Sequence, residues 1–275
     1  MRILITGHKG QLGRALLARW PDAVGADLPE VDITTPDSID AAIEAARPEV
    51  IIHCAALTDV DGAARDPALA YRINGLGTQN VAQAAARAGA ALAYVSTNEV
   101  FDGAKRTPYF EFDPANPINP YGQSKLAGEW FTAHLTSRFY IIRTAWLSAR
   151  GGRNFVHRVQ QLADERGGLR VVTDEVANPT FVDDLADAIV KLIGAGRFGI
   201  YHLTNAGHCS RYDYARKILE LSGRGYIPVK PITLADFARP STPPPFAALA
   251  NTAAAALGIT LRPWEEALRE FLSIK

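Results

Sequence analysis

Tyr121 and Lys125 stand four residues apart in the segment PYGQSK, residues 120–125. On a helix this spacing places both side chains on one face. An ammonium beside a phenol favours the phenolate and lowers the tyrosine pKa towards neutral pH. The pair therefore predicts that Tyr121 is a general acid, which protonates a carbonyl oxygen while hydride arrives at the carbonyl carbon.

A glycine-rich turn, GHKGQLG at residues 7–13, follows the apolar run Ile3–Ile5 and opens a helical pattern. Glycines allow a tight turn and a close approach of the backbone to a pyrophosphate, and the helix N-terminus supplies unpaired N–H groups. In this context the turn predicts a dinucleotide-binding site. The expected cofactor contacts from the turn are Gly7, Lys9, Gly10, Gln11, Leu12 and Gly13.

Asp27 ends the second apolar run, about 20 residues after the glycines begin. A carboxylate at this place accepts hydrogen bonds from the adenosine ribose hydroxyls and repels a 2′-phosphate. The sequence therefore favours NAD over NADP as the cofactor. Lys9 and Arg14 lie nearby in the sequence and can soften this preference.

The elements that must hold these residues follow from an alternation of short apolar runs with helical patterns. Continuous apolar runs separated by helices are typical of strands buried on both faces of a parallel sheet. We therefore predict a doubly wound α/β sheet, with a dinucleotide-binding domain over residues 1–150. Its expected strands are Ile3–Ile5, Val24–Ala26, Val50–His53, Leu92–Val95 and Tyr140–Ile142, and its expected helices are Leu12–Trp20, Pro36–Ala46, Pro67–Ala88 and one from about Tyr121.

Beyond Arg150 the pattern loosens, and residues 151–275 are predicted to form mainly a smaller substrate-binding lobe, with some segments returning to the sheet. The expected elements are helices near Phe155–Arg166, Asp183–Ile193, Asp213–Leu221 and Pro263–Leu272, and a strand at Arg170–Val172.

The composition narrows the class of protein. Hydrophobic residues make up 48% and charged residues 21%, with 29 basic and 29 acidic residues, which is typical of a globular chain and leaves no excess charge to bind nucleic acid or a lipid surface. No apolar run reaches the ~20 residues of a membrane span, and the N-terminus does not resemble a signal peptide, so a cytoplasmic protein is expected. Cys54 and Cys209 are far apart and lack metal-ligand spacing, which predicts buried thiols and no metal site.

Further motifs accompany the glycine turn and the Tyr121–Lys125 pair. They are VDIT at 31–34, CAALTDVD at 54–61, STNEVFDG at 96–103, NPYGQSK at 119–125, RTAWL at 143–147, NPT at 178–180 and Arg239-Pro240. Together they resemble the extended short-chain dehydrogenase/reductase superfamily and, within it, the dTDP-4-dehydrorhamnose reductase family. The likeness spans nearly the whole chain.

The resemblance implies a Rossmann-type fold and the reduction, by NADH or NADPH, of the C4 ketone of a nucleotide-linked 4-keto-6-deoxy-hexose. Tyr121 would donate the proton, Lys125 would hold the nicotinamide ribose and lower the tyrosine pKa, and Thr97 would bind the reacting oxygen of the sugar. Tyr121 is also expected to contact the cofactor. The further cofactor contacts are Asp32, Ile33, Ala55, Ala56, Thr58 and Ser96, and the substrate contacts that the resemblance implies are Trp146, Asn154 and Arg239. Trp146 also fits a core position, since it follows an apolar strand. A homodimer is a further expectation, and a Mg²⁺ ion at such an interface is not readable from the sequence.

Two departures from the family pattern mark the substrate side. Asn98 and Glu99 replace the usual Asp and Tyr, and Glu175 and Ala177 replace the usual Gln and Gly. Asn98 and Glu99 are therefore expected to contact the substrate in this chain's own way. Ser-Thr-Asn-Glu-Val also resembles the Thr-Asp-Glu segment of sugar-nucleotide dehydratases, in which Glu99 would be a base, although Asn98 cannot donate a proton as a carboxylic acid does.

Two alternatives to a reductase are therefore open. One is a sugar-nucleotide dehydratase or epimerase that uses Glu99. The other is a non-catalytic regulatory subunit, similar to the β subunit of methionine adenosyltransferase, because fold does not fix function. The intact Thr97, Tyr121 and Lys125 favour an active enzyme.

Overall fold

A six-stranded parallel sheet forms the centre of the computed structural model, which describes residues 1–152 and 154–273. Its order is β10-β5-β4-β3-β1-β2, and each neighbouring pair is parallel. The strands are β1 (Ile3–Thr6), β2 (Val24–Ala26), β3 (Val50–His53), β4 (Ala91–Thr97), β5 (Phe139–Thr144) and β10 (Gly199–His202). The prediction of a doubly wound α/β fold is confirmed.

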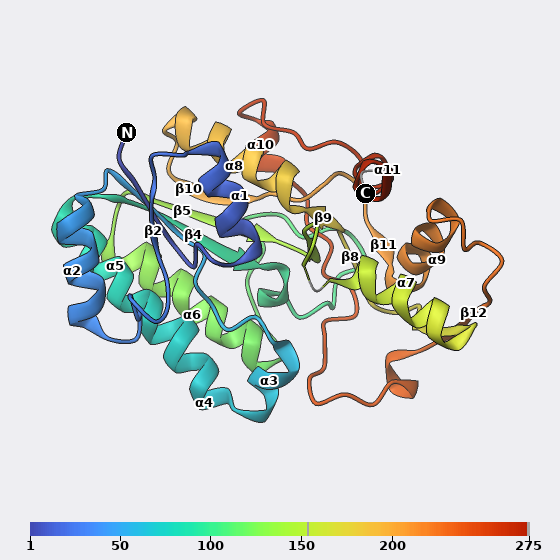
Figure 1. Cartoon of the computed structure of the whole chain (residues 1–275). Helices are drawn as coiled ribbons and strands as arrows, with labels where there is room; N and C mark the ends of the chain where they lie inside the picture. Colours follow the sequence, from blue (N-terminus) through green and yellow to red (C-terminus); the bar gives the residue numbers. More distant parts are fainter. Residues whose placement is uncertain (153, 274–275) are drawn as a thin grey trace.

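Helices cover both faces of this sheet (Figure 1). One layer contains α1 (Gln11–Arg19), α8 (Val182–Ala195) and the short α10 (Thr252–Ala255), and the other contains α2 (Pro36–Ala46), α5 (Thr78–Ala88) and α6 (Pro120–Leu135). Ile5 packs in the first layer's core with Leu16, and its neighbour Leu4 packs in the second with Ile39. Because successive strand residues point to opposite faces, two buried faces require an unbroken apolar run.

The strand order places a ligand crevice at the carboxyl edge of the sheet. The chain passes from β1 to β2 on one side of β1, and then crosses to β3 on the other side. Ligands of open α/β sheets bind where the strand order reverses in this way. The residues that follow β1, β3 and β4 therefore meet at one place.

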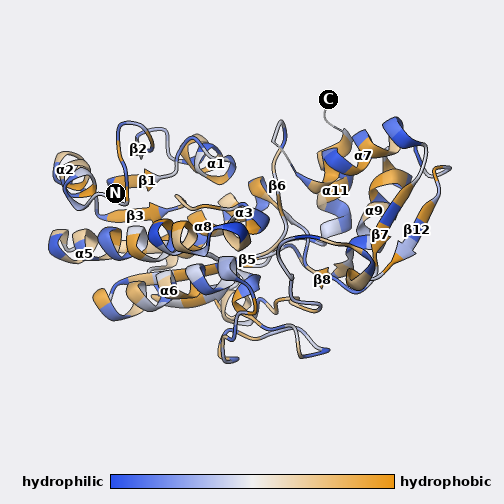
Figure 2. Cartoon of the chain, turned by 90° about the horizontal axis from the view of Figure 1, so that it is seen from below, coloured by the Kyte–Doolittle hydropathy of each residue, from blue (hydrophilic) through white to orange (hydrophobic). Residues whose placement is uncertain are grey.

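A separate lobe lies beside the carboxyl edge, at the right of Figure 2. It contains α7 (Phe155–Arg166), α9 (Arg211–Leu221) and α11 (Trp264–Ser273), with the paired strands β7 (Leu169–Val172) and β12 (Val229–Ile232). Buried side chains such as Val156, Tyr214 and Leu268 form its own core. Two short strand pairs, β6 (Leu147–Ser148) with β9 (Thr180–Phe181) and β8 (Val176–Ala177) with β11 (Cys209–Ser210), also belong to this half of the chain.

The helix predicted over Pro67–Ala88 is divided in the structure. It consists of α4 (Pro67–Ala70), a π-helical segment η1 (Tyr71–Gly77) and α5, and it follows a helix that was not predicted, α3 (Val60–Arg65). Asn74 lies within the π-helical turn, where its side chain accepts a hydrogen bond from the N–H of Leu57 and donates one to the carbonyl of Leu57. A π-helical bulge of this kind is frequent beside functional sites. Here it fixes the loop that follows β3.

In the part of the chain that the structure describes, no helix is long and apolar enough to cross a membrane.

Candidate active site

The glycine turn forms a cradle between β1 and α1 in which side chains have no room. Gly7 has a positive φ of 70°, and a Cβ atom on it would lie 2.6 Å from the backbone nitrogen of Ala55. A Cβ atom on Gly13 would lie 2.4 Å from the carbonyl oxygen of Gly7. At these two positions the turn therefore presents backbone alone before the N-terminus of α1, an arrangement that fits the pyrophosphate of a dinucleotide.

A cavity of about 900 Å³ opens from this cradle along the carboxyl ends of the strands. It brings together most of the side chains that the sequence singled out. The predicted site residues on its wall are Gly7, Gly10, Gln11, Leu12, Gly13, Asp27, Asp32, Ile33, Ala55, Ala56, Thr58, Ser96, Thr97, Asn98, Glu99, Tyr121, Lys125 and Trp146. Lys9, Asn154 and Arg239 are not on this wall.

The Asp27 carboxylate holds the glycine turn as well as facing the cavity. Its two oxygens accept the N–H groups of Lys9 and Leu28, both at 2.9 Å. The Lys9 ammonium is directed elsewhere, to Glu30 at 2.8 Å and to the Leu28 carbonyl. The backbone of Lys9 therefore lies at the site while its charge is paired on the surface, and the expected contact of this residue with the cofactor stays a prediction.

Tyr121 and Lys125 lie on the first turns of α6. An N-cap residue and a proline fix where this helix begins. The Asn119 side chain accepts the N–H of Gly122 at 2.8 Å, and Pro120 occupies the first helical position. Gly122 is needed because a Cβ atom there would lie 2.1 Å from the carbonyl oxygen of Glu99. The helix therefore packs closely against the segment after β4, which carries Thr97.

The pKa of Tyr121 differs from the expectation. Burial raises it well above its usual value, the nearby Glu99 raises it further, and a hydrogen bond with Thr97 only partly offsets this. Lys125 is itself buried, which lowers its pKa to about 7, and its ammonium donates to the Val95 carbonyl at 2.8 Å. The predicted lowering of the tyrosine pKa by Lys125 is therefore wrong for this structure. The phenol stays protonated at neutral pH, the form that a proton donor needs.

Ser96 is on the cavity wall, but its hydroxyl is directed into the protein. The hydroxyl donates to the Glu129 carboxylate at 2.5 Å, and Arg143 binds the same carboxylate through two nitrogens, at 2.9 and 2.7 Å. All three side chains are buried. This hydroxyl helps anchor the end of β4 beside Thr97, and the expected contact of Ser96 with the cofactor stays a prediction.

Asn98 and Glu99 belong to a short 3-10 helix, η2 (Asn98–Val100), and have different surroundings. The Asn98 amide donates to the Ala247 carbonyl at 3.1 Å, so its donor group holds a distant loop against the site. The Glu99 carboxylate accepts the Asn119 amide at 2.7 Å, and burial raises its pKa to about 7. Near neutral pH, Glu99 thus adds a titrating group beside Tyr121.

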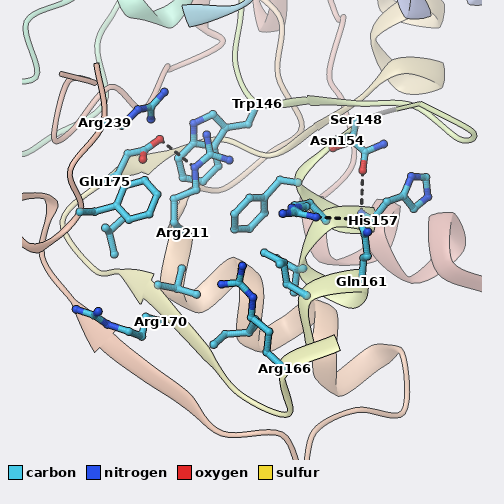
Figure 3. Close-up of a pocket in the computed structure, with 18 of the residues that line it drawn as sticks. Trp146, Ser148, Asn154, His157, Gln161, Arg166, Arg170, Glu175, Arg211 and Arg239 are labelled. Atoms are coloured by element: carbon cyan, nitrogen blue, oxygen red, sulfur yellow. Dashed lines mark hydrogen bonds and ion pairs between the residues drawn. The ribbon is translucent and has the colours of Figure 1, made fainter. Parts of the chain in front are cut away.

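A second cavity, of about 1050 Å³, lies in the lobe between α7, β7 and the loop after residue 236 (Figure 3). Trp146, Asn154 and Arg239 are on its wall. Trp146 has a φ of 42°, which is uncommon for a non-glycine residue. Asn154 caps α7 by accepting the N–H of His157, and Arg239 pairs with Asp61 at 3.0 Å, so both predicted substrate contacts also have structural partners.

Two residues at this site were missed as binding residues. Arg211 begins α9 and lies on the walls of both cavities, and Glu175 pairs with it at 2.9 Å. No local pattern marks Arg211, because its partner is 36 residues away.

Cys54 was expected to be buried but is partly exposed on the cofactor-side cavity, whereas Cys209 is buried as predicted.

No group of three or more His, Cys, Asp or Glu side chains that could hold a metal ion occurs in residues 1–152 and 154–273.

The parallel sheet, the glycine cradle and the Tyr121–Lys125 pair define an NAD(P)-dependent oxidoreductase of the extended short-chain dehydrogenase/reductase class. The family model described as the RmlD substrate binding domain matches residues 1–275. The chain belongs to this dTDP-4-dehydrorhamnose reductase family.

Individual relatives agree over nearly the full length. The chain is 39% identical to a dTDP-4-dehydrorhamnose reductase of Mycobacterium tuberculosis, over 99% of this chain and 92% of the relative. It is 36% identical to the spore coat polysaccharide biosynthesis protein SpsK of Bacillus subtilis, over 98% and 96% of the two chains. The structure of the Bacillus anthracis dTDP-4-dehydrorhamnose reductase in complex with NADP matches with a TM-score of 0.95 and 38% identity, over 100% of this chain and 99% of the other.

Proposed function

We propose that the protein transfers hydride from NADH or NADPH to the C4 ketone of dTDP-4-dehydrorhamnose, or of a close analogue, and so forms dTDP-L-rhamnose. One observation carries the proposal: Thr97, Tyr121 and Lys125 meet on the wall of one cavity that begins at the glycine cradle. Relatives named for this activity cover the whole chain.

In the proposed reaction the nicotinamide supplies the hydride, and the residues of this chain handle the oxygen. Thr97 and Tyr121 hydrogen-bond the C4 carbonyl oxygen, which polarises the carbonyl bond. As negative charge develops on this oxygen, the protonated Tyr121 transfers its proton there. Lys125 lies one helical turn away on the same cavity wall, where it would hold the nicotinamide ribose.

The cofactor preference follows from Asp27. Its carboxylate faces the ribose end of the cavity, while the Lys9 ammonium is paired with Glu30. We therefore expect kcat/KM to be higher with NADH than with NADPH, because a 2′-phosphate would meet a carboxylate that no ion pair among the described residues neutralises. Parallel assays with the two cofactors check this, and a higher value with NADPH would contradict it.

We also propose a cytoplasmic location, checked by cell fractionation, and a homodimer, checked by the mass of the protein in solution.

The dehydratase alternative lacks a proton donor at the required place. Asn98 has an amide where the dehydratase segment has an acid, and this amide donates to the Ala247 carbonyl. The structure therefore favours the reductase over a dehydratase. The regulatory-subunit alternative is tested by turnover, because it predicts cofactor binding without oxidation of the cofactor.

The titration of Glu99 predicts a change in rate with pH. Its pKa is raised to about 7, so it is neutral below that pH and negative above it. The negative form raises the pKa of Tyr121 and weakens it as an acid, so kcat should fall about three- to tenfold as the pH rises through 7. In the variant Glu99→Gln this fall should become smaller, since only the titration of Lys125 then remains near pH 7. Glu220→Gln, on an exposed part of α9, is the control. An identical pH profile in Glu99→Gln would exclude Glu99 as the cause.

The test of the proposed function is the loss of reduced-nicotinamide absorbance with dTDP-4-dehydrorhamnose generated in place. We expect one cofactor to be oxidised for each dTDP-L-rhamnose formed. Cofactor binding without oxidation would contradict the proposal and direct attention to other 4-keto sugars or to a protein partner.

A further inference from the structure

The two cavities meet at a junction that carries one charged side chain. Among the described residues, only Trp146, Leu147 and Arg211 lie on both walls. Leu147 is apolar and Trp146 offers a ring and a single N–H. Any ligand that extends from Tyr121 into the lobe must therefore pass the guanidinium of Arg211.

Arg211 is held in one orientation by its neighbours (Figure 3). Its Nε donates to Glu175 Oε1 at 2.9 Å, and its guanidinium carbon lies 3.6 Å from the centre of the Trp146 ring and 4.8 Å from that of Phe155. In the part of the chain that the structure describes, neither terminal nitrogen has a hydrogen-bond partner. A guanidinium that is fixed through Nε and stacked on an indole still presents a planar pair of donors, which matches two phosphate oxygens.

The other arginines near the path lie differently. Arg239 also pairs with a carboxylate through Nε, Asp61 at 3.0 Å, but it is on the wall of the lobe cavity only, as are Arg158, Arg166 and Arg170. Arg72 is on the wall of the cofactor-side cavity only. In the proposed function the sugar lies beside Tyr121, and the lobe cavity beyond the junction has room for the nucleoside. The phosphate that joins the sugar is then the group at the junction.

We propose that the terminal nitrogens of Arg211 bind the sugar-linked phosphate of the nucleotide diphosphate, while Glu175 and Trp146 hold the guanidinium in place. This inference rests on the proposed function. Charge-assisted, two-point contact with a phosphate gives affinity as well as geometry. Arg211 would thereby distinguish a nucleoside diphosphate from a monophosphate, because the monophosphate lacks the group that reaches the junction.

Calorimetric binding of dTDP and of dTMP, each with saturating NAD⁺, tests this role without any turnover. Relative to wild type, Arg211→Gln should weaken dTDP binding about 10- to 100-fold and dTMP binding by less than about threefold. The double variant, Glu175→Gln with Arg211→Gln, should show the same two changes in affinity as the single variant. It serves if Arg211→Gln is unstable, because it does not leave the Glu175 carboxylate without its partner. Arg216→Gln is the matched control, because Arg216 is an exposed arginine on the same helix, away from both cavities.

Three results would separate the possible failures. Unchanged dTDP binding in both Arg211 variants would overturn the role of Arg211 while leaving the proposed function intact. Equal weakening of dTDP and dTMP would also overturn it, since the residue would then not read the sugar-linked phosphate. Failure of the wild-type protein to bind dTDP would instead overturn the nucleotide named in the proposed function, and with it this inference.

Discussion

Replacing Tyr121 with Phe is expected to lower kcat by about 10²- to 10⁴-fold, the usual contribution of a positioned general acid. The phenol is the group on the cavity wall whose raised pKa keeps it protonated at neutral pH. Without it the oxygen at C4 must take its proton from water while hydride arrives. Initial rates of cofactor oxidation at saturating substrate measure the loss.

The same variant should bind the cofactor almost as well as the wild type, because the glycine cradle and Asp27 are distant from the missing hydroxyl. Fluorescence titration with NADH or NADPH provides this control. An undiminished kcat in Tyr121→Phe would exclude this residue as the proton donor. A parallel loss of cofactor affinity would instead indicate that the ring packs the site.

Replacing Glu129 with Gln is expected to lower the free energy of unfolding by about 3–5 kcal/mol, because it leaves the buried Arg143 without its partner. The Glu129 carboxylate accepts hydrogen bonds from Ser96 and, through two nitrogens, from Arg143. An amide keeps the shape of this side chain and loses its charge. Urea unfolding followed by circular dichroism measures the change.

Glu220→Gln provides the matched comparison for stability. It removes the same kind of charge from an exposed pair with Lys217, for which a loss of at most about 1 kcal/mol is expected. If the two variants were equally stable, the buried pair would contribute no more than a surface pair, and our account of how β4 is anchored would be wrong.

The features that the sequence predicted are those determined by neighbours in the chain. The glycine turn, the spacing of Tyr121 and Lys125 and the bounds of α7 and β3 depend on residues a few positions apart. The fold class followed from the same local alternation of apolar runs and helices. The motif residues after β1, β3 and β4 could be grouped because parallel strands end at one edge.

The features that were missed depend on residues far apart in the chain. Arg211 meets Glu175, Arg239 meets Asp61 and Asn98 reaches Ala247 over separations of 36 to 178 residues. The direction of the Tyr121 pKa shift was also wrong, because spacing shows which charge is near but not how deeply the phenol is buried. The acceptor of the Ser96 hydroxyl was missed for a related reason, since Glu129 is 33 residues away in the sequence.

The most direct test of the central claim is the fate of the hydride. The reduced cofactor is prepared with deuterium at the transferred position of the nicotinamide C4 and is incubated with the protein and dTDP-4-dehydrorhamnose in ordinary water. Mass spectrometry and NMR of the sugar nucleotide then locate the label. Our account predicts dTDP-L-rhamnose with one deuterium at C4 for each cofactor oxidised. Reduced sugar without deuterium at C4, or unchanged keto sugar while the cofactor is consumed, would contradict it.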